Sequence, residues 1–191
     1  MTKVFIDGSA GTTGLRIVDR LSQRSDLELL ILPDELRKDA SARADALSTA
    51  DIAFLCLPDD AAKESAALAA GMKVKIIDTS TAHRVDPDWV YGMPELAGQT
   101  EKILESSRIA NPGCHASGFV ALVAPLVQAG ILPKDAALTS FSLTGYSGGG
   151  KKMIAEYEAE NPDPLLKGPR QYALTQSHKH LKEMVKLCGL E

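Results

Sequence analysis

Over the first 85 residues, short aliphatic runs alternate with segments of helical periodicity, and this pattern limits the possible folds most strongly. The predicted strands are residues 4–6, 27–32, 52–57 and 74–77. The run 52–57 is apolar throughout, which is typical of a strand buried on both faces of a parallel sheet. Strands that alternate with helices imply right-handed crossovers, so the sequence predicts a Rossmann-type, doubly wound α/β fold.

Two helices are predicted between these strands. One covers about residues 13–22, directly after a glycine-rich turn. The other is the alanine-rich stretch 59–70, which Gly71 ends in a position suited to a C-cap.

The second half has a different, α+β layout. Residues 108–110 are a candidate last strand of the first part, and the chain then turns at residues 111–113, Asn-Pro-Gly. An apolar helix is predicted over 117–129 and strand character over 137–143. We expect the seam between the two parts near Asn111.

Composition and charge exclude several classes of protein. A hydrophobic share of 45% and a charged share of 24% are those of an ordinary globular chain, not of a disordered tail or a collagen-like repeat. The net charge of −4 argues against nucleic-acid or membrane partners held by bulk electrostatics. Three cysteines without CxxC spacing indicate neither a disulfide framework nor a metal site. With no secretory signal and no apolar span of roughly 20 residues, we expect a cytoplasmic protein.

A glycine-rich turn, GxxGxxG, follows the first predicted strand. Glycines allow a backbone to turn tightly and approach a pyrophosphate, whose charge is met by N–H groups at a helix N-terminus. The spacing differs from the usual GxGxxG, and a plain structural turn is the alternative. Its place at the start of a βαβ unit favours dinucleotide binding. The expected cofactor-binding residues here are Gly8, Ser9, Ala10, Gly11, Thr12, Thr13 and Gly14.

Charged residues follow the second predicted strand, where NAD-binding proteins usually carry an acidic side chain for the ribose hydroxyls. Residues 34–38 offer both signs, and Arg37 with Lys38 could hold a 2′-phosphate, which favours NADP. A solvated charged loop is an equal alternative. Leu57 and Pro58, at the end of the third predicted strand, are also expected to contact the cofactor.

Cys114 is the strongest candidate for a catalytic residue. The turn at 111–113 delivers it at or near the start of the apolar helix, where backbone N–H groups favour a thiolate over a thiol and could hold an oxyanion. A lone cysteine is more often a small buried hydrophobe, but this placement favours a nucleophile. Cys56, in a predicted strand, and Cys188, in a predicted helix, are interpreted as structural.

Several motifs occur in the order seen in N-acetyl-gamma-glutamyl-phosphate reductases, and the chain resembles that family throughout its length. The motifs are residues 8–14, Asn-Pro-Gly-Cys at 111–114, Gly-Tyr-Ser-Gly-Gly-Gly-Lys at 145–151 and Ser-His-Lys-His at 177–180, with the shorter Asp-Thr-Ser at 78–80 and Tyr-Gly-Met-Pro-Glu-Leu at 91–96. His115 after the cysteine is similar to the short bacterial form. Related semialdehyde dehydrogenases share the architecture and the cysteine chemistry.

The resemblance implies an NADPH-dependent oxidoreductase of arginine biosynthesis. Cys114 would attack N-acetyl-glutamyl phosphate, and hydride transfer to the thioester would release the semialdehyde. His178 and His180 are the acid–base candidates, because an imidazole titrates near neutrality. On an extended segment both would face the same way, and we expect His180 to act. His115 is expected to point elsewhere.

The resemblance also implies contacts with cofactor and substrate. Arg84 is a plausible anion partner, since an arginine presents a fork of two donors. His83 is either part of this region or a surface residue. The expected substrate-binding residues are Ser80, Arg84, Asn111 and Lys151, and further cofactor-binding residues are Ser147, Gly148 and Gly149. A plain flexible loop is the alternative for residues 145–151.

The resemblance divides the chain into an NADP-binding Rossmann domain, residues 1–112, and the N-terminal part of a catalytic and dimerisation domain, residues 113–191. Relatives continue well past the position of Glu191, so we expect an incomplete catalytic domain with an exposed sheet edge and an uncovered apolar face. Lys182 stands where the family often has proline. A small-molecule substrate and, at full length, a homo-oligomer are expected.

Two alternatives remain. One is an enzyme similar to aspartate-semialdehyde dehydrogenase, against which the motifs around Cys114 and at 177–180 argue. The other is a nucleotide-binding chain without activity.

Overall fold

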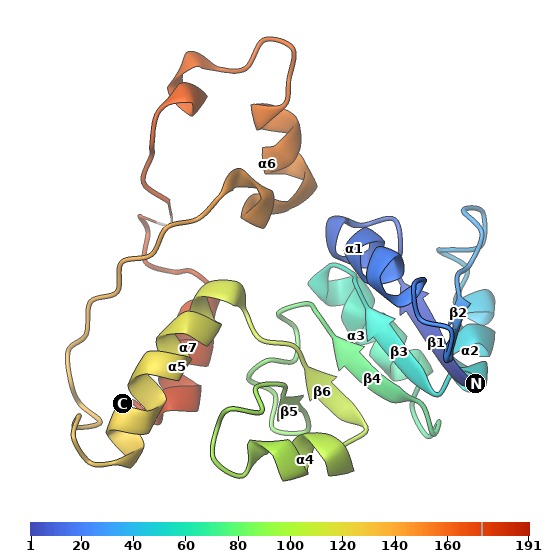
Figure 1. Ribbon diagram of the computed structural model, residues 1–191, viewed down its shortest axis with the longest axis horizontal. Helices are drawn as coiled ribbons and strands as arrows, with labels where there is room; N and C mark the ends of the chain where they lie inside the picture. Colours follow the sequence, from blue (N-terminus) through green and yellow to red (C-terminus); the bar gives the residue numbers. More distant parts are fainter. Residues whose placement is uncertain (173) are drawn as a thin grey trace.

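A parallel sheet of six strands, in the order β2-β1-β3-β4-β6-β5, forms the first part of the chain (Figure 1). This computed structural model describes residues 1–172 and 174–191, apart from the side chain of Thr12. The strands are β1 (Thr2–Asp7), β2 (Leu27–Leu30), β3 (Ile52–Leu55), β4 (Lys75–Asp78), β5 (Val90–Tyr91) and β6 (Arg108–Ala110). Every pairing is parallel. The predicted doubly wound α/β class is therefore confirmed.

Helices cover both faces of this sheet and form the rest of the molecule. The helices are α1 (Thr12–Leu21), α2 (Ala40–Thr49), α3 (Asp59–Leu68), α4 (Gln99–Glu105), α5 (Cys114–Gln128), α6 (Gly150–Tyr157) and α7 (His180–Cys188), with two 3-10 turns, η1 (Tyr146–Gly149) and η2 (Pro164–Lys167). Sequence periodicity missed α2, whose apolar positions are mostly alanines. The N-cap of α2 is Asp39, whose carboxylate accepts the Ala42 N–H at 2.7 Å.

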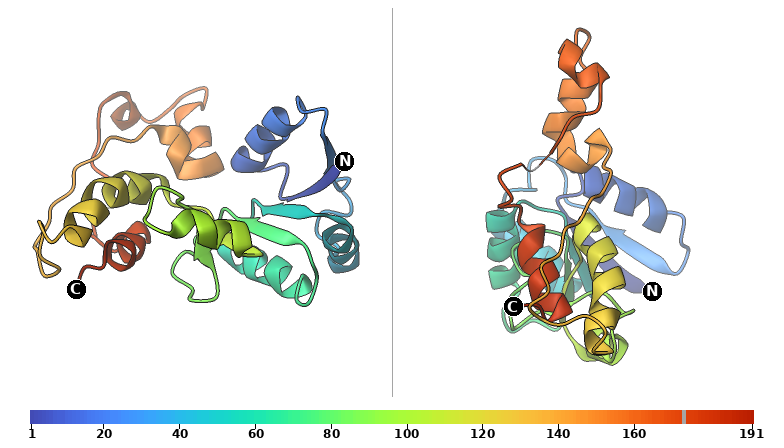
Figure 2. Two further views of the ribbon diagram at one scale, coloured as in Figure 1. Left: turned by 60° about the horizontal axis from the view of Figure 1, so that its bottom comes forward. Right: turned by 90° about the vertical axis from the view of Figure 1, so that its left-hand side faces the viewer.

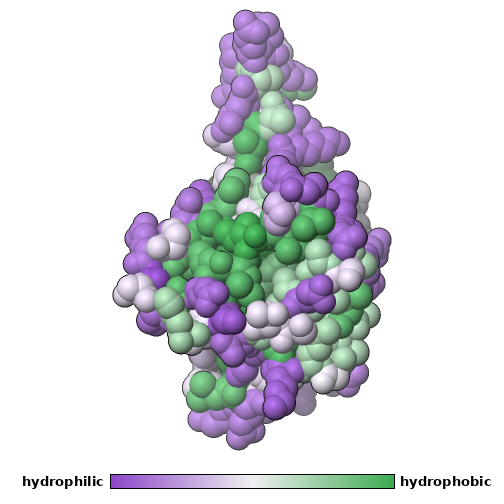
Figure 3. All heavy atoms as spheres, turned by 90° about the vertical axis from the view of Figure 1, so that its right-hand side faces the viewer, coloured by the Kyte–Doolittle hydropathy of each residue, from purple (hydrophilic) through white to green (hydrophobic). Residues whose placement is uncertain are grey.

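The main core lies between the sheet and the helices α2 and α3. Alternate residues of β3 show this, because Ala53 and Leu55 are fully buried whereas Ile52 and Phe54 are partly exposed. Helix α1 lies on the other face of the sheet (Figure 2). That face stays partly open, with a cavity of about 430 Å³ lined in part by Phe54 and Ile77. Apolar side chains also gather on the side of the molecule seen in Figure 3.

A smaller core joins the end of the sheet to the helices α5 and α7, which lie side by side (Figures 1 and 2). Its buried members are Tyr91, Met93, Val120, Ala124 and Cys188. Beyond α5 the chain extends away from this core, and α6 lies near α1 (Figure 1). Among the described residues, no helix is long and apolar enough to cross a membrane.

Two sequence predictions about the second half need correction. The structure has no strand at 137–143, although that segment has strand character. Phe141 is 90% exposed and Leu143 is 86% exposed. A strand forms only where a neighbouring strand pairs its N–H and C=O groups, and the described residues provide none there. The helix predicted over 117–129 begins three residues earlier, at Cys114.

Candidate active site

Cys114 is the first residue of α5 and is exposed, and Gly113 is the N-cap of that helix. The Gly113 carbonyl accepts both the backbone N–H of Ser117, at 2.8 Å, and its hydroxyl, at 2.9 Å. The first N–H groups of an α-helix have no partner within the helix, so they are free to stabilise negative charge near the thiol. The structure therefore places the thiol where sequence reasoning expected it.

Gly113 allows two functional side chains to approach the backbone next to Cys114. A Cβ atom at this position would lie 2.5 Å from Nε2 of His180 and 2.7 Å from Nη1 of Arg84. Its φ of −72° is ordinary for any residue, so glycine is needed here for space.

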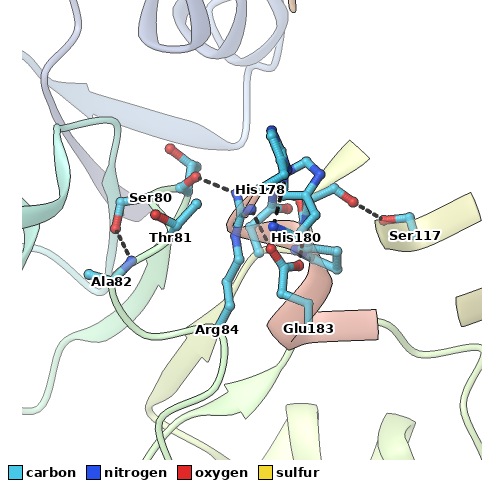
Figure 4. A network of polar contacts seen from close by, with 12 residues as sticks. Ser80, Thr81, Ala82, Arg84, Ser117, His178, His180 and Glu183 are labelled. Carbon is cyan, nitrogen blue, oxygen red and sulfur yellow. Dashed lines mark hydrogen bonds and ion pairs between the residues drawn. The ribbon is translucent and has the colours of Figure 1, made fainter. Parts of the chain in front are cut away.

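His180 and His178 lie together at the start of α7, and the close-up shows their contacts (Figure 4). Their ring centroids are 4.4 Å apart in a T-shaped arrangement, and the His180 N–H donates to His178 Nδ1 at 3.2 Å. The expected extended segment with parallel side chains is wrong, because the Leu181 N–H bonds back to the His178 carbonyl and turns the chain into the helix. The two rings consequently meet edge to face.

Burial keeps both histidines in the neutral form. It lowers the pKa of His180 to about 4 and also lowers the pKa of His178. Both imidazoles are therefore neutral at pH 7 and able to accept a proton. The Nδ1 atom of His180 is buried without a hydrogen-bond partner, while Nε2 lies toward Gly113.

His115 lies near this pair, and the expectation that it points away from Cys114 stays a prediction. Its ring centroid is 6.2 Å from that of His180, and its Nδ1 is 2.7 Å from the Ser142 hydroxyl. Helix α7 packs against α5, which brings the rings of His115 and His180 near each other.

Glu183 organises the site, and sequence reasoning assigned it no role. Its side chain is 2% exposed. Oε1 accepts from Arg84 at 2.8 Å, and Oε2 accepts from the Tyr91 hydroxyl at 2.9 Å and from the Gly113 N–H at 3.0 Å. Burial, followed by the Glu183 charge, raises the pKa of Tyr91. The sequence feature that could have indicated this role is the position of Glu183 three residues after His180, which places both side chains on the same face of a helix.

Arg84 and Ser80 lie near the site but are bonded within the protein (Figure 4). Besides its contact with Glu183, Arg84 donates from Nη2 to the Thr79 carbonyl at 3.1 Å. The Ser80 hydroxyl donates to Asp78 at 2.7 Å, and the same carboxylate bonds Nδ1 of His83 at 2.7 Å. His83 is buried and stacks on Trp89, so it is not a surface residue. The loop after β4 is thus held by Asp78.

The glycine-rich turn has the geometry of a close backbone approach. Gly8 has a φ of +84°, and a Cβ there would overlap the Cys56 carbonyl. A Cβ at Gly14 would overlap the Gly8 carbonyl. The Gly11 N–H bonds to the Gly8 carbonyl at 3.0 Å and closes the turn at the start of α1. These features fit a dinucleotide pyrophosphate. The prediction for the Thr12 side chain lies outside the described residues.

Other expected cofactor residues surround this turn. A Cβ at Gly8 would lie 3.0 Å from the Leu57 side chain, and Pro58 is the N-cap of α3. Arg37 follows β2 and pairs with Asp34 at 3.1 Å, while its Nε is buried without a partner. Because Nε is buried, a phosphate would have to meet the Arg37 guanidinium through its Nη atoms.

The glycine loop at 145–151 lies beside the same turn. Lys151 Nζ donates to the Ala10 carbonyl at 2.6 Å. A shallow cavity of about 380 Å³ lies between this loop and α1, and its lining is Thr13, Arg16, Ile17, Arg20, Ser147 and Gly148. The structure thus places Lys151, expected to bind substrate, against the glycine-rich turn.

The structure also places Asn111 and the two other cysteines. Asn111 is exposed, and its N–H bonds to the Asp78 carbonyl at 2.7 Å, next to the turn that carries Cys114. Cys56 is half-buried, and burial raises the pKa of its thiol to about 11. Cys188 is buried in the α5–α7 core. Among the described residues, no three His, Cys, Asp or Glu side chains are grouped to hold a metal.

Two family models match most of the chain. The model described as semialdehyde dehydrogenase, NAD binding domain, matches residues 33–105, and the model described as semialdehyde dehydrogenase, dimerisation domain, matches residues 114–190. The chain belongs to the semialdehyde dehydrogenase family.

Within that family, the similarity to N-acetyl-gamma-glutamyl-phosphate reductases is strong. Proteins of that name from Sinorhizobium medicae and Chelativorans sp. are 51% and 53% identical over 98% and 95% of this chain. The resemblance inferred from the motifs is confirmed. The chain spans 61% and 58% of the length of these two relatives.

Solved structures show the same fold. Aspartate semialdehyde dehydrogenase II from Vibrio cholerae superposes with a TM-score of 0.64 at 17% identity, over 99% of this chain and 66% of that one. The enzyme from Francisella tularensis gives 0.59 at 21% identity, over 82% of this chain and 48% of that one.

Proposed function

We propose that the chain carries the cofactor site and the nucleophile of an NADPH-dependent N-acetyl-gamma-glutamyl-phosphate reductase, which forms N-acetyl-glutamate 5-semialdehyde and phosphate in arginine biosynthesis. The observation that carries the proposal is the exposed Cys114 at the start of α5, beside a buried, neutral His180. Relatives of that name, 51% and 53% identical to the chain, support the choice of substrate.

In the first step, Cys114 forms a thioester. Its Sγ attacks the acyl carbon, and the bond from that carbon to the phosphate oxygen breaks. His180 accepts the thiol proton and returns it to the departing phosphate. His178 is the second candidate for this proton transfer. It directly follows residues 174–177, which are exposed.

The start of α5 stabilises the charge that develops on the substrate oxygen. The Gly113 N–H is already bonded to Glu183, so the oxyanion is left to the N–H groups of the first helical turn. NADPH, when bound, supplies the hydride that reduces the thioester to the aldehyde. The thiolate of Cys114 is then released and takes up a proton from solvent.

The cofactor contacts proposed are those that surround the glycine-rich turn. The turn itself holds the pyrophosphate, with Leu57, Pro58 and residues 147–149 beside it. Arg37 takes the 2′-phosphate, because it follows β2 and its side chain remains 32% exposed. For the substrate, we propose a direct contact from Asn111, while Ser80 and Arg84 act by holding the site in shape. Lys151, expected from the sequence to bind substrate, is proposed to hold the glycine-rich turn instead, because it donates to the Ala10 carbonyl.

The two parts of the chain have separate proposed roles. We propose residues 1–112 as the NADP-binding domain and residues 113–191 as the N-terminal part of the catalytic and dimerisation domain of a homo-oligomer. A reducing, cytoplasmic environment belongs to the proposal, because the mechanism needs Cys114 as a free thiol.

The reaction run in reverse tests the substrate. We expect phosphate-dependent reduction of NADP⁺ with N-acetyl-glutamate semialdehyde, and no comparable rate with aspartate semialdehyde. A faster rate with aspartate semialdehyde would contradict the proposed substrate. The nucleophile is tested separately on the chain by alkylation, where peptide mass spectrometry should find Cys114 modified well before Cys56 and Cys188.

A further inference from the structure

A buried charged cluster lies directly beneath the glycine-rich turn. Asp7, the last residue of β1, is 3% exposed, and Arg43 of α2 is 4% exposed. Oδ2 of Asp7 accepts from Arg43 Nε at 3.0 Å and from the Ser65 hydroxyl of α3 at 2.7 Å. The cluster therefore joins β1, α2 and α3 at the residue that precedes Gly8.

The position of Asp7 is unfavourable for a charge. Its side chain points to the same face of β1 as Phe5, which belongs to the apolar core against α2 and α3. A buried carboxylate is costly unless it is paired, and this one adjoins a turn whose geometry fits an anion. Without compensation, its charge would repel a phosphate bound at the turn.

Arg43 is held so that it supplies this compensation. Besides Asp7, its guanidinium donates to Glu64 Oε1 at 3.0 Å and to the Ala61 carbonyl at 3.3 Å. These contacts direct the side chain inward from α2 and fix it under the turn.

We propose that Arg43 neutralises Asp7 beneath the glycine-rich turn and that this buried ion pair sets the affinity of the turn for the dinucleotide phosphates. The inference rests on the proposed function, in which that turn binds NADPH. Asp7 and Arg43 are positioning residues, because both are buried behind the turn and act through its backbone and its electrostatic potential.

The decisive variant is Asp7→Asn, which is isosteric and leaves Arg43 with its Glu64 and Ala61 contacts. If charge governs affinity, removal of the carboxylate tightens NADPH binding, with a Kd at least about threefold lower in a fluorescence titration. If Asp7 only supports the backbone, its weaker hydrogen bonds leave the Kd unchanged or higher, and that result overturns the proposal.

Arg43→Met should change the affinity for NADPH in the opposite direction. It leaves the Asp7 charge uncompensated, and we expect the Kd for NADPH to rise at least about tenfold. The double variant Asp7→Asn/Arg43→Met should return the Kd to within about threefold of the wild type, whereas a purely structural role predicts that the double variant binds worst. If Arg43→Met does not fold, Asp7→Asn and the double variant still decide.

Asp45→Asn is the matched control, because it makes the same chemical change at an exposed position of α2. Its Kd should equal that of the wild type. Equal affinity in all variants overturns this inference alone. Failure of the wild-type chain to bind NADPH overturns the proposed function and this inference together.

Discussion

Arg84 and Glu183 form a buried ion pair, with 2.8 Å between Nη1 and Oε1, that joins the loop after β4 to helix α7. The other oxygen of Glu183 accepts the N–H of Gly113, the residue before the nucleophile. One carboxylate therefore connects three segments that are distant in the sequence and sets where Cys114 lies relative to His180.

Loss of this carboxylate should affect both stability and catalysis. Glu183→Gln leaves the Arg84 charge buried and unpaired, so we expect the free energy of unfolding to fall by about 3 kcal/mol in urea denaturation. A lower kcat with little change in KM for NADPH should accompany it, because the partners of Glu183 are Arg84, Tyr91 and Gly113 and not residues of the glycine-rich turn.

The double variant Arg84→Met/Glu183→Gln separates charge from packing. Since it removes both charges, it should recover part of the lost stability. A double variant as unstable as the sum of both single variants would show that the pair is not coupled.

Cys114→Ser should abolish turnover while NADPH binding persists, because a serine hydroxyl at this position is a far weaker nucleophile than a thiolate. Steady-state assays and fluorescence titration measure the two properties. Cys188→Ala, in the α5–α7 core, serves as control and should lower stability while the remaining folded protein keeps its activity. Retained turnover in Cys114→Ser would refute the thioester mechanism.

Gly113→Ala should lower kcat by about 100-fold, because the new methyl group displaces His180 and Arg84 from the nucleophile turn. Gly118→Ala is its control in the same helix. No atom lies within 4 Å of a Cβ at Gly118, so that variant should keep its activity and gain up to about 1 kcal/mol of stability. Equal activities in the two variants would contradict the packing argument.

The stability of the protein should fall as the pH is lowered from 6.5 to 4. The pKa of His180 is about 4 in the folded protein and has an ordinary value of 6.5, so in this range the unfolded chain binds a proton that the folded protein does not. The free energy of unfolding is therefore highest above pH 6.5 and declines through this window.

His180→Gln tests this assignment, and thermal unfolding across the pH range measures it. The variant should flatten the decline without removing it, because burial lowers the pKa of His178 in the same direction. An unchanged pH profile in His180→Gln would show that this histidine does not contribute.

The first part of the fold was predictable because its signals are local. Apolar runs marked the strands β1, β3 and β4 to within a few residues, and the glycine pattern marked the turn before α1. The helix α2 was missed because its alanines give no clear apolar face. The segment 137–143 was overpredicted, since strand propensity cannot show whether a partner strand exists.

The sequence by itself determined the α/β class, the family and the position of Cys114 at a helix start, because each depends on residues close together in the chain. Only the tertiary structure decided that Glu183 organises the site and that Asp7 and Arg43 are paired beneath the glycine-rich turn. These contacts span 99, 70 and 36 positions between Arg84 and Glu183, Gly113 and Glu183, and Asp7 and Arg43. No local pattern encodes them, since they exist only where the packing of helices on the sheet brings buried charges within hydrogen-bonding distance.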